Sequence, residues 1–464
     1  MSKEKQLQLY QYLWKGIGGL LILLAWLEGF YINSTRFIGV LILVLLLCNA
    51  IFGIILKKNK KALGTITLSF SGIAILFEMI WFFSDWYPGF VIAQAFTIII
   101  GFSCFYMSRS ISEKHNHSAG KTKEWRPIIR LLELAGVVIL SLVSIAVIIN
   151  SITPVPLMSF IQWQIGDGNT YNAPEMEQTV LDNGYLRIND IEYGSDYPNS
   201  YLDAYVVDDE NNIDRPTYFY VHGGGWTKGD KEMEDIAYYE SMLDAGYNVV
   251  SINYALSPEY RYPAPLVQLS QAVAFMQEHG EDYGIDMSKV IFAGSSAGGQ
   301  IVGQFLNVQT NPAYADEMRM EPVIYRDNIT AGVLDSAALD IERMGKTKAP
   351  AAFSNWTFFQ FSRTYFQLKH FINGTDQYAK QGNVIDHVTE NFPPVFIADG
   401  NTGSYPDQAK DLSDKLNDFG ITNYLYLVDR DKATLGHVFM DTKSKYTLDY
   451  ADKKVAFLNK ILEK

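Results

Sequence analysis

The chain of 464 residues contains only two cysteines, Cys48 and Cys104. Both lie inside long apolar runs, so the sequence offers no disulfide framework. Positive charge is scarce after residue 150: residues 151–464 carry 24 Lys and Arg against 44 Asp and Glu, whereas residues 1–150 carry 14 against 7. This acidic balance argues against nucleic acid as a partner, because phosphate binding requires clustered Lys and Arg.

The basic first part is rich in apolar runs. Five of them approach the roughly 20 residues that cross a hydrocarbon core as a helix. They are residues 14–32, 37–56, 62–83, 90–107 and 131–149. We therefore predict a membrane domain with about five transmembrane helices in residues 1–150, with the lipid bilayer as a partner. Glu78 is the most deeply placed carboxylate, and we interpret it as a protonated or helix-paired residue of a packed bundle.

The positive charges predict the orientation of this domain. Lys and Arg gather before the first apolar run, after the second and after the fourth. Because loops rich in Lys and Arg stay in the cytoplasm, the N-terminus is predicted to be cytoplasmic. Five crossings then place the chain from residue 151 onward outside the cell, as part of a multi-pass protein of the cell membrane.

After a predicted linker at residues 151–174, strand-like and helix-like segments alternate. Strands are predicted at residues 218–221, 247–253, 290–293, 331–334, 394–398 and 423–428, and helices at residues 234–245, 265–278 and 405–419. Alternation of this kind predicts a mostly parallel sheet with helices on both faces. Residues 175–464 are thus expected to form one α/β domain, with reactive groups at the carboxyl ends of its strands.

An aromatic insertion near residues 340–386 interrupts the alternation. Its aromatic residues are Phe353, Trp356, Phe358, Phe359, Phe361, Tyr365, Phe366 and Phe371. One interpretation is a lid that lines an acyl or aromatic pocket. The other is a set of amphipathic helices that pack on the sheet or rest on the bilayer surface.

Two glycine-rich motifs follow predicted strands. Gly294-Ser295-Ser296-Ala297-Gly298-Gly299 joins a strand to a helix, and such a sharp turn exposes the hydroxyl of Ser296 as a nucleophile. His222-Gly223-Gly224-Gly225-Trp226 follows another strand. Its bare backbone can turn N–H groups toward one point, which suits the oxyanion of acyl transfer.

A serine nucleophile needs a base that is oriented by a carboxylate. Residues 151–464 contain five histidines: His222, His279, His370, His387 and His437. Only His437 follows the last strand, where the order serine, acid, histidine places the base. The acid is expected after the strand 394–398, where Asp399 and Asp407 are available. Asp399 is preferred because it is nearest the strand end, whereas Asp407 falls in the cap region of the next helix.

Asp335 and Asp340, after the preceding strand, are the remaining alternatives for the acid.

Residues 200–464 resemble the α/β-hydrolases, in particular the carboxylesterases of the hormone-sensitive-lipase-like group. The resemblance rests on the motifs at residues 222–226, 254–265, 294–299 and 436–439. It implies that Ser296 is the nucleophile, that His437 is the base, and that the amides of Gly223, Gly224 and Ala297 form the oxyanion hole. The position where this family has its acid is Gly403 here.

Together these patterns predict a membrane-anchored serine carboxylesterase or deacylase that hydrolyses short-acyl or acetyl esters of small molecules or glycans. The mechanism requires no metal or organic cofactor. Two alternatives stay open: an exopeptidase or amidase of the same fold, and a non-catalytic surface receptor or scaffold with a degenerate site.

Overall fold

The structure is a computed structural model. It describes residues 3–30, 36–57, 61–84, 86–116, 126–166, 168–171, 173, 175–181, 184–207, 215–233, 236–349, 351, 353–367 and 376–463. Within these residues the chain forms two compact units, residues 1–156 and residues 157–464. Each unit is described by itself.

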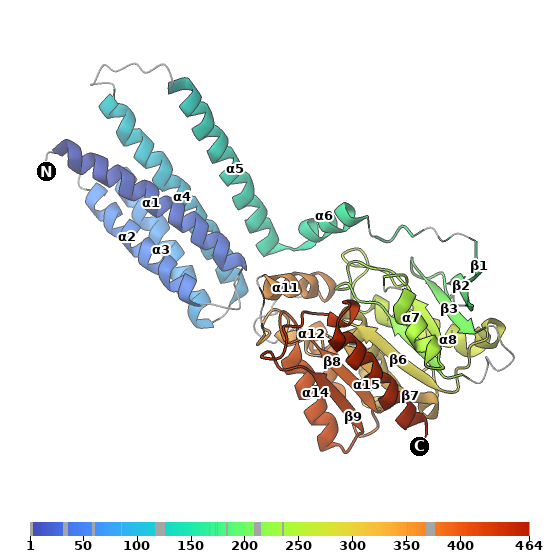
Figure 1. Cartoon of the computed structure of the whole chain (residues 1–464). Coiled ribbons are helices and arrows are strands. Elements are labelled where there is room, and N and C mark those ends of the chain that lie inside the picture. Colours follow the sequence, from blue (N-terminus) through green and yellow to red (C-terminus); the bar gives the residue numbers. More distant parts are fainter. Residues whose placement is uncertain are drawn as a thin grey trace. The chain divides into compact units, whose positions relative to one another are not determined.

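The first unit is helical (Figure 1). Its helices are α1 (Lys3–Phe30), α2 (Arg36–Lys57), α3 (Lys61–Ser84), α4 (Tyr87–Asn116) and α5 (Arg126–Ile152). Each contains a segment of 19 to 23 residues that is long and apolar enough to cross a membrane. Helices α1 to α4 pack closely on one another, whereas α5 buries only 6% of its apolar window. These helices coincide with the five apolar runs of the sequence.

Two carboxyl groups meet inside this bundle. A Cβ atom added to Gly39 of α2 would lie 2.9 Å from Glu78 Oε1 and 3.4 Å from Glu28 Oε1. Both glutamates are buried, and they come from α3 and α1. Glu78 therefore lies in a packed helix interface beside a second carboxyl group.

The predicted linker is partly helical. Residues 151 and 152 end α5, and helix α6 covers Val155–Ile165. Pro156 falls in the first turn of α6, where the missing amide hydrogen of proline costs no helical hydrogen bond. The apolar residues that follow it continue the helix, so the predicted linker is helical over these residues.

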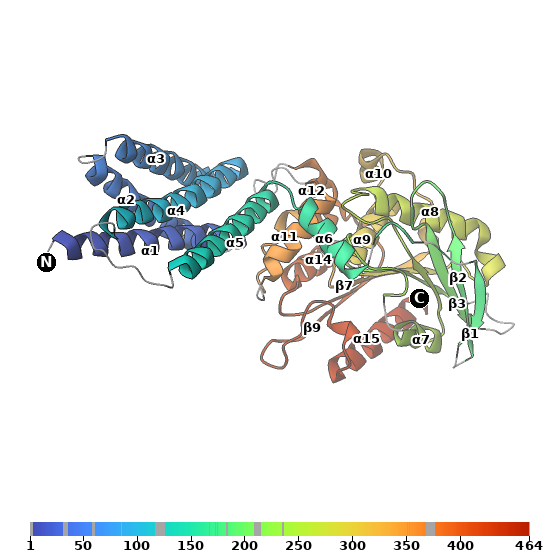
Figure 2. The ribbon, with the colours of Figure 1, turned by 90° about the horizontal axis from the view of Figure 1, so that it is seen from above.

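The second unit contains a nine-stranded sheet in the order β1-β2-β3-β5-β4-β6-β7-β8-β9. The strands are β1 (Glu177–Val180), β2 (Tyr185–Glu192), β3 (Tyr201–Val207), β4 (Thr217–Val221), β5 (Asn248–Ile252), β6 (Val290–Ser295), β7 (Ile329–Asp335), β8 (Val395–Asp399) and β9 (Asn423–Leu427). Strands β4 to β9 are parallel and match the six predicted strands. Strands β1 to β3 add an antiparallel edge that the sequence analysis did not predict (Figure 2).

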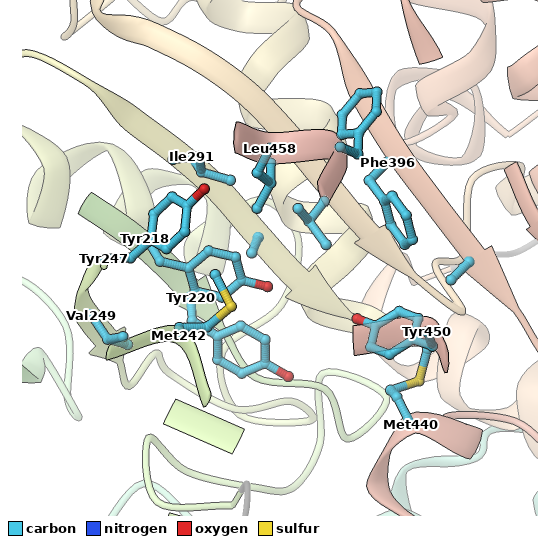
Figure 3. Packing of buried hydrophobic residues seen from close by; sticks show 14 of the residues in the cluster. Tyr218, Tyr220, Met242, Tyr247, Val249, Ile291, Phe396, Met440, Tyr450 and Leu458 are labelled. Atoms are coloured by element: carbon cyan, nitrogen blue, oxygen red, sulfur yellow. The ribbon is translucent and has the colours of Figure 1, made fainter. Parts of the chain in front are cut away.

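Helices cover both faces of the sheet. They are α7 (Ile236–Asp244), α8 (Ala264–His279), α9 (Ala297–Thr310), α10 (Pro312–Met318), α11 (Ser354–Tyr365), α12 (Gln377–Gln381), α13 (Val384–His387), α14 (Pro406–Asp418) and α15 (Lys445–Leu462). On one face, Tyr218 and Tyr220 of β4 pack with Met242 of α7 and with Tyr450 and Leu458 of α15 (Figure 3).

On the other face, Phe219 and Phe292 pack together, and Phe305 of α9 packs on Phe292. Neighbours along a strand thus enter opposite cores, as the two-residue period of a strand requires.

The predicted insertion contains α11, α12 and the start of α13. Its residues 350, 352 and 368–375, which include His370 and Phe371, lie outside the described residues.

Candidate active site

Ser296 lies at a sharp turn between β6 and α9. Its backbone has φ 51° and ψ −113°, a strained combination for a residue with a side chain. The surrounding glycines make this turn possible, because a Cβ atom on Gly298 would lie 2.0 Å from Val221 O and one on Gly294 would lie 2.6 Å from the backbone of Gly298. The motif is therefore required by close backbone packing, and it presents the serine hydroxyl at the carboxyl end of β6.

His437 is in contact with this hydroxyl. Its Nε2 lies 2.8 Å from Ser296 Oγ, although 140 residues separate the two in the chain. Desolvation lowers the pKa of His437 from its usual 6.5 to about 4. The imidazole is thus neutral near pH 7, as a general base has to be before it accepts a proton.

The group on the other side of the imidazole is a serine and not a carboxylate. His437 Nδ1 lies 2.7 Å from Ser404 Oγ, and Ser404 Oγ donates a hydrogen bond to Asp399 Oδ1. The structure therefore connects Asp399 to the base through one intervening hydroxyl. Asp399 is the last residue of β8, and the loop that follows it brings Ser404 between the carboxyl group and the ring.

The carboxyl groups of the other predicted acids bond to other side chains. Asp407, in the first turn of α14, has its Oδ2 3.3 Å from Arg343 Nη1. Asp340 also pairs with Arg343, and Asp335 accepts a hydrogen bond from Tyr450. Among these four carboxylates, Asp399 is the one whose printed hydrogen bonds lead to His437, through the Ser404 hydroxyl, so the geometry favours Asp399 as the acid of the site.

The carboxyl group of Asp399 is buried and surrounded by donors. Its Oδ1 accepts the Gly400 amide at 2.7 Å, and its Oδ2 accepts the Tyr405 amide at 3.1 Å. Desolvation nevertheless raises the pKa of Asp399 from its usual 3.8 to about 7, since the hydrogen bonds from Ser404, Ser336 and the two amides offset only part of it. The site therefore contains a carboxyl group that titrates near neutral pH.

The loop that carries Ser404 is tied to the loop that carries His437. Asn401 donates to Ala433 O at 2.7 Å and accepts from the Leu435 amide at 3.1 Å. A Cβ atom on Gly400 would lie 2.0 Å from Gly436 O. This close packing fixes the base relative to the acid.

The glycine loop after β4 has its amide groups oriented by Tyr254. The Tyr254 hydroxyl donates to the carbonyls of both His222 and Gly223, at 2.9 Å and 3.0 Å. In a trans peptide the N–H points opposite to the C=O. The amides of Gly223 and Gly224 therefore point away from Tyr254. Both glycines line the same cavity as Ser296 and His437, and Ala297 is the first residue of α9 beside the nucleophile.

The cavity at the site has a volume of about 250 Å³. Helix α11 contributes Thr357, Phe358 and Phe361 to its wall, together with Met344 and Tyr405 from neighbouring segments. The same helix also packs on the glycine loop: the Tyr365 ring stacks on Trp226 at 4.9 Å with an interplanar angle of 5°. Phe358, Phe361 and Tyr365 are spaced so that they share one face of α11, which lines the cavity and one turn further on packs against Trp226.

The other described histidines of the second unit, His222, His279 and His387, lie outside this arrangement. His387 contacts Lys380 O at 3.0 Å and stacks on Tyr314, and His279 ends α8. His222 stacks on Tyr254 beneath the glycine loop. Sequence reasoning missed Ser404 and Asn401, and the one available signal was the missing carboxylate at Gly403, which directed attention to this loop without identifying the substitute.

The class of the second unit follows from its fold, its site and its relatives. Residues 202–416 match the BD-FAE family. An alpha/beta hydrolase of Acanthamoeba polyphaga mimivirus is 26% identical over 160 residues, which are 34% of this chain and 44% of that protein. Esterase LipI of Mycobacterium tuberculosis is 32% identical over 149 residues, which are 32% of this chain and 46% of that protein. The matched regions thus span less than half of these curated relatives.

Among solved structures, the crystal structure of inhibited esterase B from Lactobacillus rhamnosis aligns with a TM-score of 0.52 and 18% sequence identity. The alignment covers 66% of this chain and 94% of that chain. The second unit has the α/β-hydrolase fold. Its BD-FAE segment and its esterase relatives confirm the resemblance to the hormone-sensitive-lipase-like carboxylesterases for this part of the chain.

Proposed function

We propose that this protein is a membrane-anchored serine carboxylesterase or deacylase that acts on short-acyl or acetyl esters. The observation that carries the proposal is the 2.8 Å contact between Ser296 Oγ and His437 Nε2, at the edge of a cavity lined by the glycine loop. The family match and the esterase relatives support the same reaction class.

The reaction proceeds by two acyl transfers. In the first, Ser296 Oγ attacks the ester carbonyl carbon while His437 Nε2 takes the hydroxyl proton. The oxyanion is held by the amides of Gly223, Gly224 and Ala297, and the imidazolium returns its proton to the leaving alkoxide. In the second, water repeats the attack on the acyl-serine, with His437 again taking and returning one proton. The products are a carboxylic acid and an alcohol.

The size of the cavity supports a short acyl group. Its volume of about 250 Å³ is below the roughly 300 to 1,000 Å³ of pockets that hold drug-sized ligands. Phe358 and Phe361 give it an apolar wall, which suits an acetyl or butyryl chain. Lys228 and Asp441 also line it and offer charged contacts to the alcohol part of the substrate, which suits a small polar molecule or a glycan.

The proposed anchor is the first unit. Its five long apolar helices support insertion in the bilayer, and its Lys and Arg residues support a cytoplasmic N-terminus and a hydrolase unit on the outer face. A tag at the C-terminus should then be removed by protease added to intact spheroplasts of the expressing host. Protection of the tag until the membrane is opened would reverse the assigned orientation.

Purified full-length protein in detergent tests the activity. We expect hydrolysis of p-nitrophenyl acetate and butyrate, slower hydrolysis of longer esters, and covalent labelling by a fluorophosphonate. The variant Ser296→Ala should lose both turnover and label. Faster cleavage of acyl anilides than of esters would favour an amidase, and absence of both turnover and labelling would favour a non-catalytic receptor or scaffold.

A further inference from the structure

We infer that Ser404 is a positioning residue, which transmits the orienting effect of the Asp399 carboxylate to His437 and makes this site a four-residue relay. The inference rests on the proposed function, because it concerns the base of the same reaction. It differs from the predicted three-residue arrangement, in which a carboxylate contacts the imidazole directly.

The count of hydrogen atoms fixes the direction of the relay. A serine hydroxyl carries one hydrogen and accepts through its lone pairs. Ser404 donates that hydrogen to Asp399 Oδ1, so toward His437 Nδ1, 2.7 Å away, it is an acceptor. Nδ1 therefore carries the ring hydrogen. Nε2 is then left with its lone pair toward Ser296 Oγ, which is the tautomer that general-base catalysis requires.

The backbone around Ser404 is held in place independently of this chain of contacts. The Gly403 amide donates to Ala349 O at 2.6 Å, and the Thr347 hydroxyl donates to the carbonyl of Ser404. Gly403 has φ +62°, a conformation in which glycine is favoured. The side chain of Ser404 is completely buried, so water does not compete for its hydrogen bonds.

The same geometry accounts for every proton during attack. The hydroxyl proton of Ser296 moves to His437 Nε2 as the bond between Oγ and the carbonyl carbon forms. The Nδ1 hydrogen stays on the imidazolium and continues to bond to Ser404 Oγ. The Ser404 hydroxyl keeps its hydrogen and continues to donate it to Asp399, whose carboxylate stays ionised. No proton moves from His437 to Ser404 or from Ser404 to Asp399. The imidazolium is stabilised by the negative charge of Asp399 and by the orientation of the Ser404 hydroxyl.

Protonation of Asp399 reverses the relay. A protonated carboxyl group can donate to Ser404 Oγ, which leaves the Ser404 hydrogen free to point at Nδ1. That arrangement favours the other tautomer, in which Nε2 carries a hydrogen toward Ser296 and cannot act as the base.

The groups that contact the Asp399 carboxyl are Ser336, Ser404 and the amides of Gly400 and Tyr405. The charged or titratable side chains on the cavity wall are Lys228, Tyr405, His437 and Asp441. Activity should therefore rise as Asp399 loses its proton.

The test uses full-length protein in detergent and p-nitrophenyl butyrate, with kcat and KM measured from about pH 5 to about pH 9. We expect Ser404→Ala to lower kcat by about 10²-fold to 10⁴-fold with KM nearly unchanged, the upper value being the loss seen when a triad aspartate is neutralised. The exchanged pair, Asp399→Ser together with Ser404→Asp, places a carboxylate directly beside Nδ1 and should recover activity to within about tenfold of the wild type.

The exchanged pair should also lose the decline in kcat that Asp399 imposes below neutral pH. The matched control is Ser413→Ala. It removes a buried serine of α14 that bonds Asn423 at 2.7 Å, and it should leave kcat unchanged.

The result that overturns the inference is a Ser404→Ala variant that keeps kcat within about threefold of the wild type. An exchanged pair that is folded but no faster than Ser404→Ala would overturn it equally. If the wild type shows neither turnover nor Ser296-dependent labelling, the proposed function fails instead. The relay is then decided by NMR of isotope-labelled histidine, in which the Nδ1 hydrogen of His437 must be present in the wild type and lost or exchanged rapidly in Ser404→Ala.

Discussion

Replacing Asp399 by asparagine should make the hydrolase unit more stable above neutral pH while it makes the enzyme slower. The folded chain holds the proton of Asp399 up to about pH 7, whereas the unfolded chain loses it near pH 3.8. The stabilisation from this proton is complete below the unfolded pKa and disappears as the pH rises through the folded pKa. Above pH 7 the wild type therefore has a buried ionised carboxylate that Asp399→Asn lacks.

The magnitude follows from the shift of the pKa. About three pKa units at 1.36 kcal/mol each give a cost of about 4 kcal/mol for the ionised group. Roughly 1.5 kcal/mol of that cost is already present at pH 5, so the stability of Asp399→Asn relative to the wild type should increase by about 2.5 kcal/mol between pH 5 and pH 8.

Urea unfolding of the full chain in detergent, read by pulse proteolysis of the hydrolase unit, measures this difference at each pH. The difference between variant and wild type cancels the titration of other groups. If the difference in unfolding free energy between Asp399→Asn and the wild type stays constant or narrows from pH 5 to pH 8, the assignment of a raised pKa to Asp399 is refuted. A loss of kcat without any pH-dependent change in this difference would mean that the carboxylate is already ionised at pH 5.

Three further changes test the oxyanion loop and the cavity. Tyr254→Phe removes the donor to the carbonyls of His222 and Gly223 and should lower kcat about 10-fold to 10²-fold with little change in KM; an unchanged kcat would show that packing alone orients these amides. Gly224→Ala adds a Cβ atom 2.0 Å from Lys228 O at φ +99°, so activity should fall more than about 10²-fold. Its control is Gly246→Ala, a position with φ +94° and open space around the added Cβ atom. A comparable loss of activity in both variants would assign the loss to backbone strain in general and not to the glycine loop. Phe361→Ala enlarges the cavity and should raise the ratio of octanoate to butyrate hydrolysis about tenfold, measured as kcat/KM; a ratio that does not move would place the acyl chain elsewhere.

Most of the parallel strands were predictable because their side chains are buried on both faces. Strands β4, β5 and β6 are completely buried and read as short apolar runs between helical segments. The antiparallel edge was not predictable in this way. Asp190 and Asp203 lie in β2 and β3, where the buried ammonium group of Lys231 contacts them at 3.1 Å and 3.0 Å. Charged residues inside a strand obscure the hydrophobic period on which the prediction depends.

The residues of the site also fall into two groups: those recognisable from their neighbours in the sequence and those whose role depends on the packing of distant segments. The turn at Ser296 and the glycine loop are local motifs, and their neighbours in sequence are the residues that the close packing requires. Ser404 has no such pattern, because a serine in a loop is common and its role depends on how that loop folds over Asp399. The position of His437 was predictable only from its order in the chain, while its contact with Ser404 depended on the packing of two loops.

The wall of the cavity and the glycine loop pack against each other at two points. Phe361 leaves no room for a side chain at Gly225, where an added Cβ atom would lie 2.6 Å from Phe361 Cγ, and Tyr365 of the same helix stacks on Trp226. Selection for bulkier substrates through helix α11 would therefore also disturb the backbone of the proposed oxyanion hole. Substrate range and turnover should evolve together in this enzyme, and a broader range should require compensating changes next to Trp226.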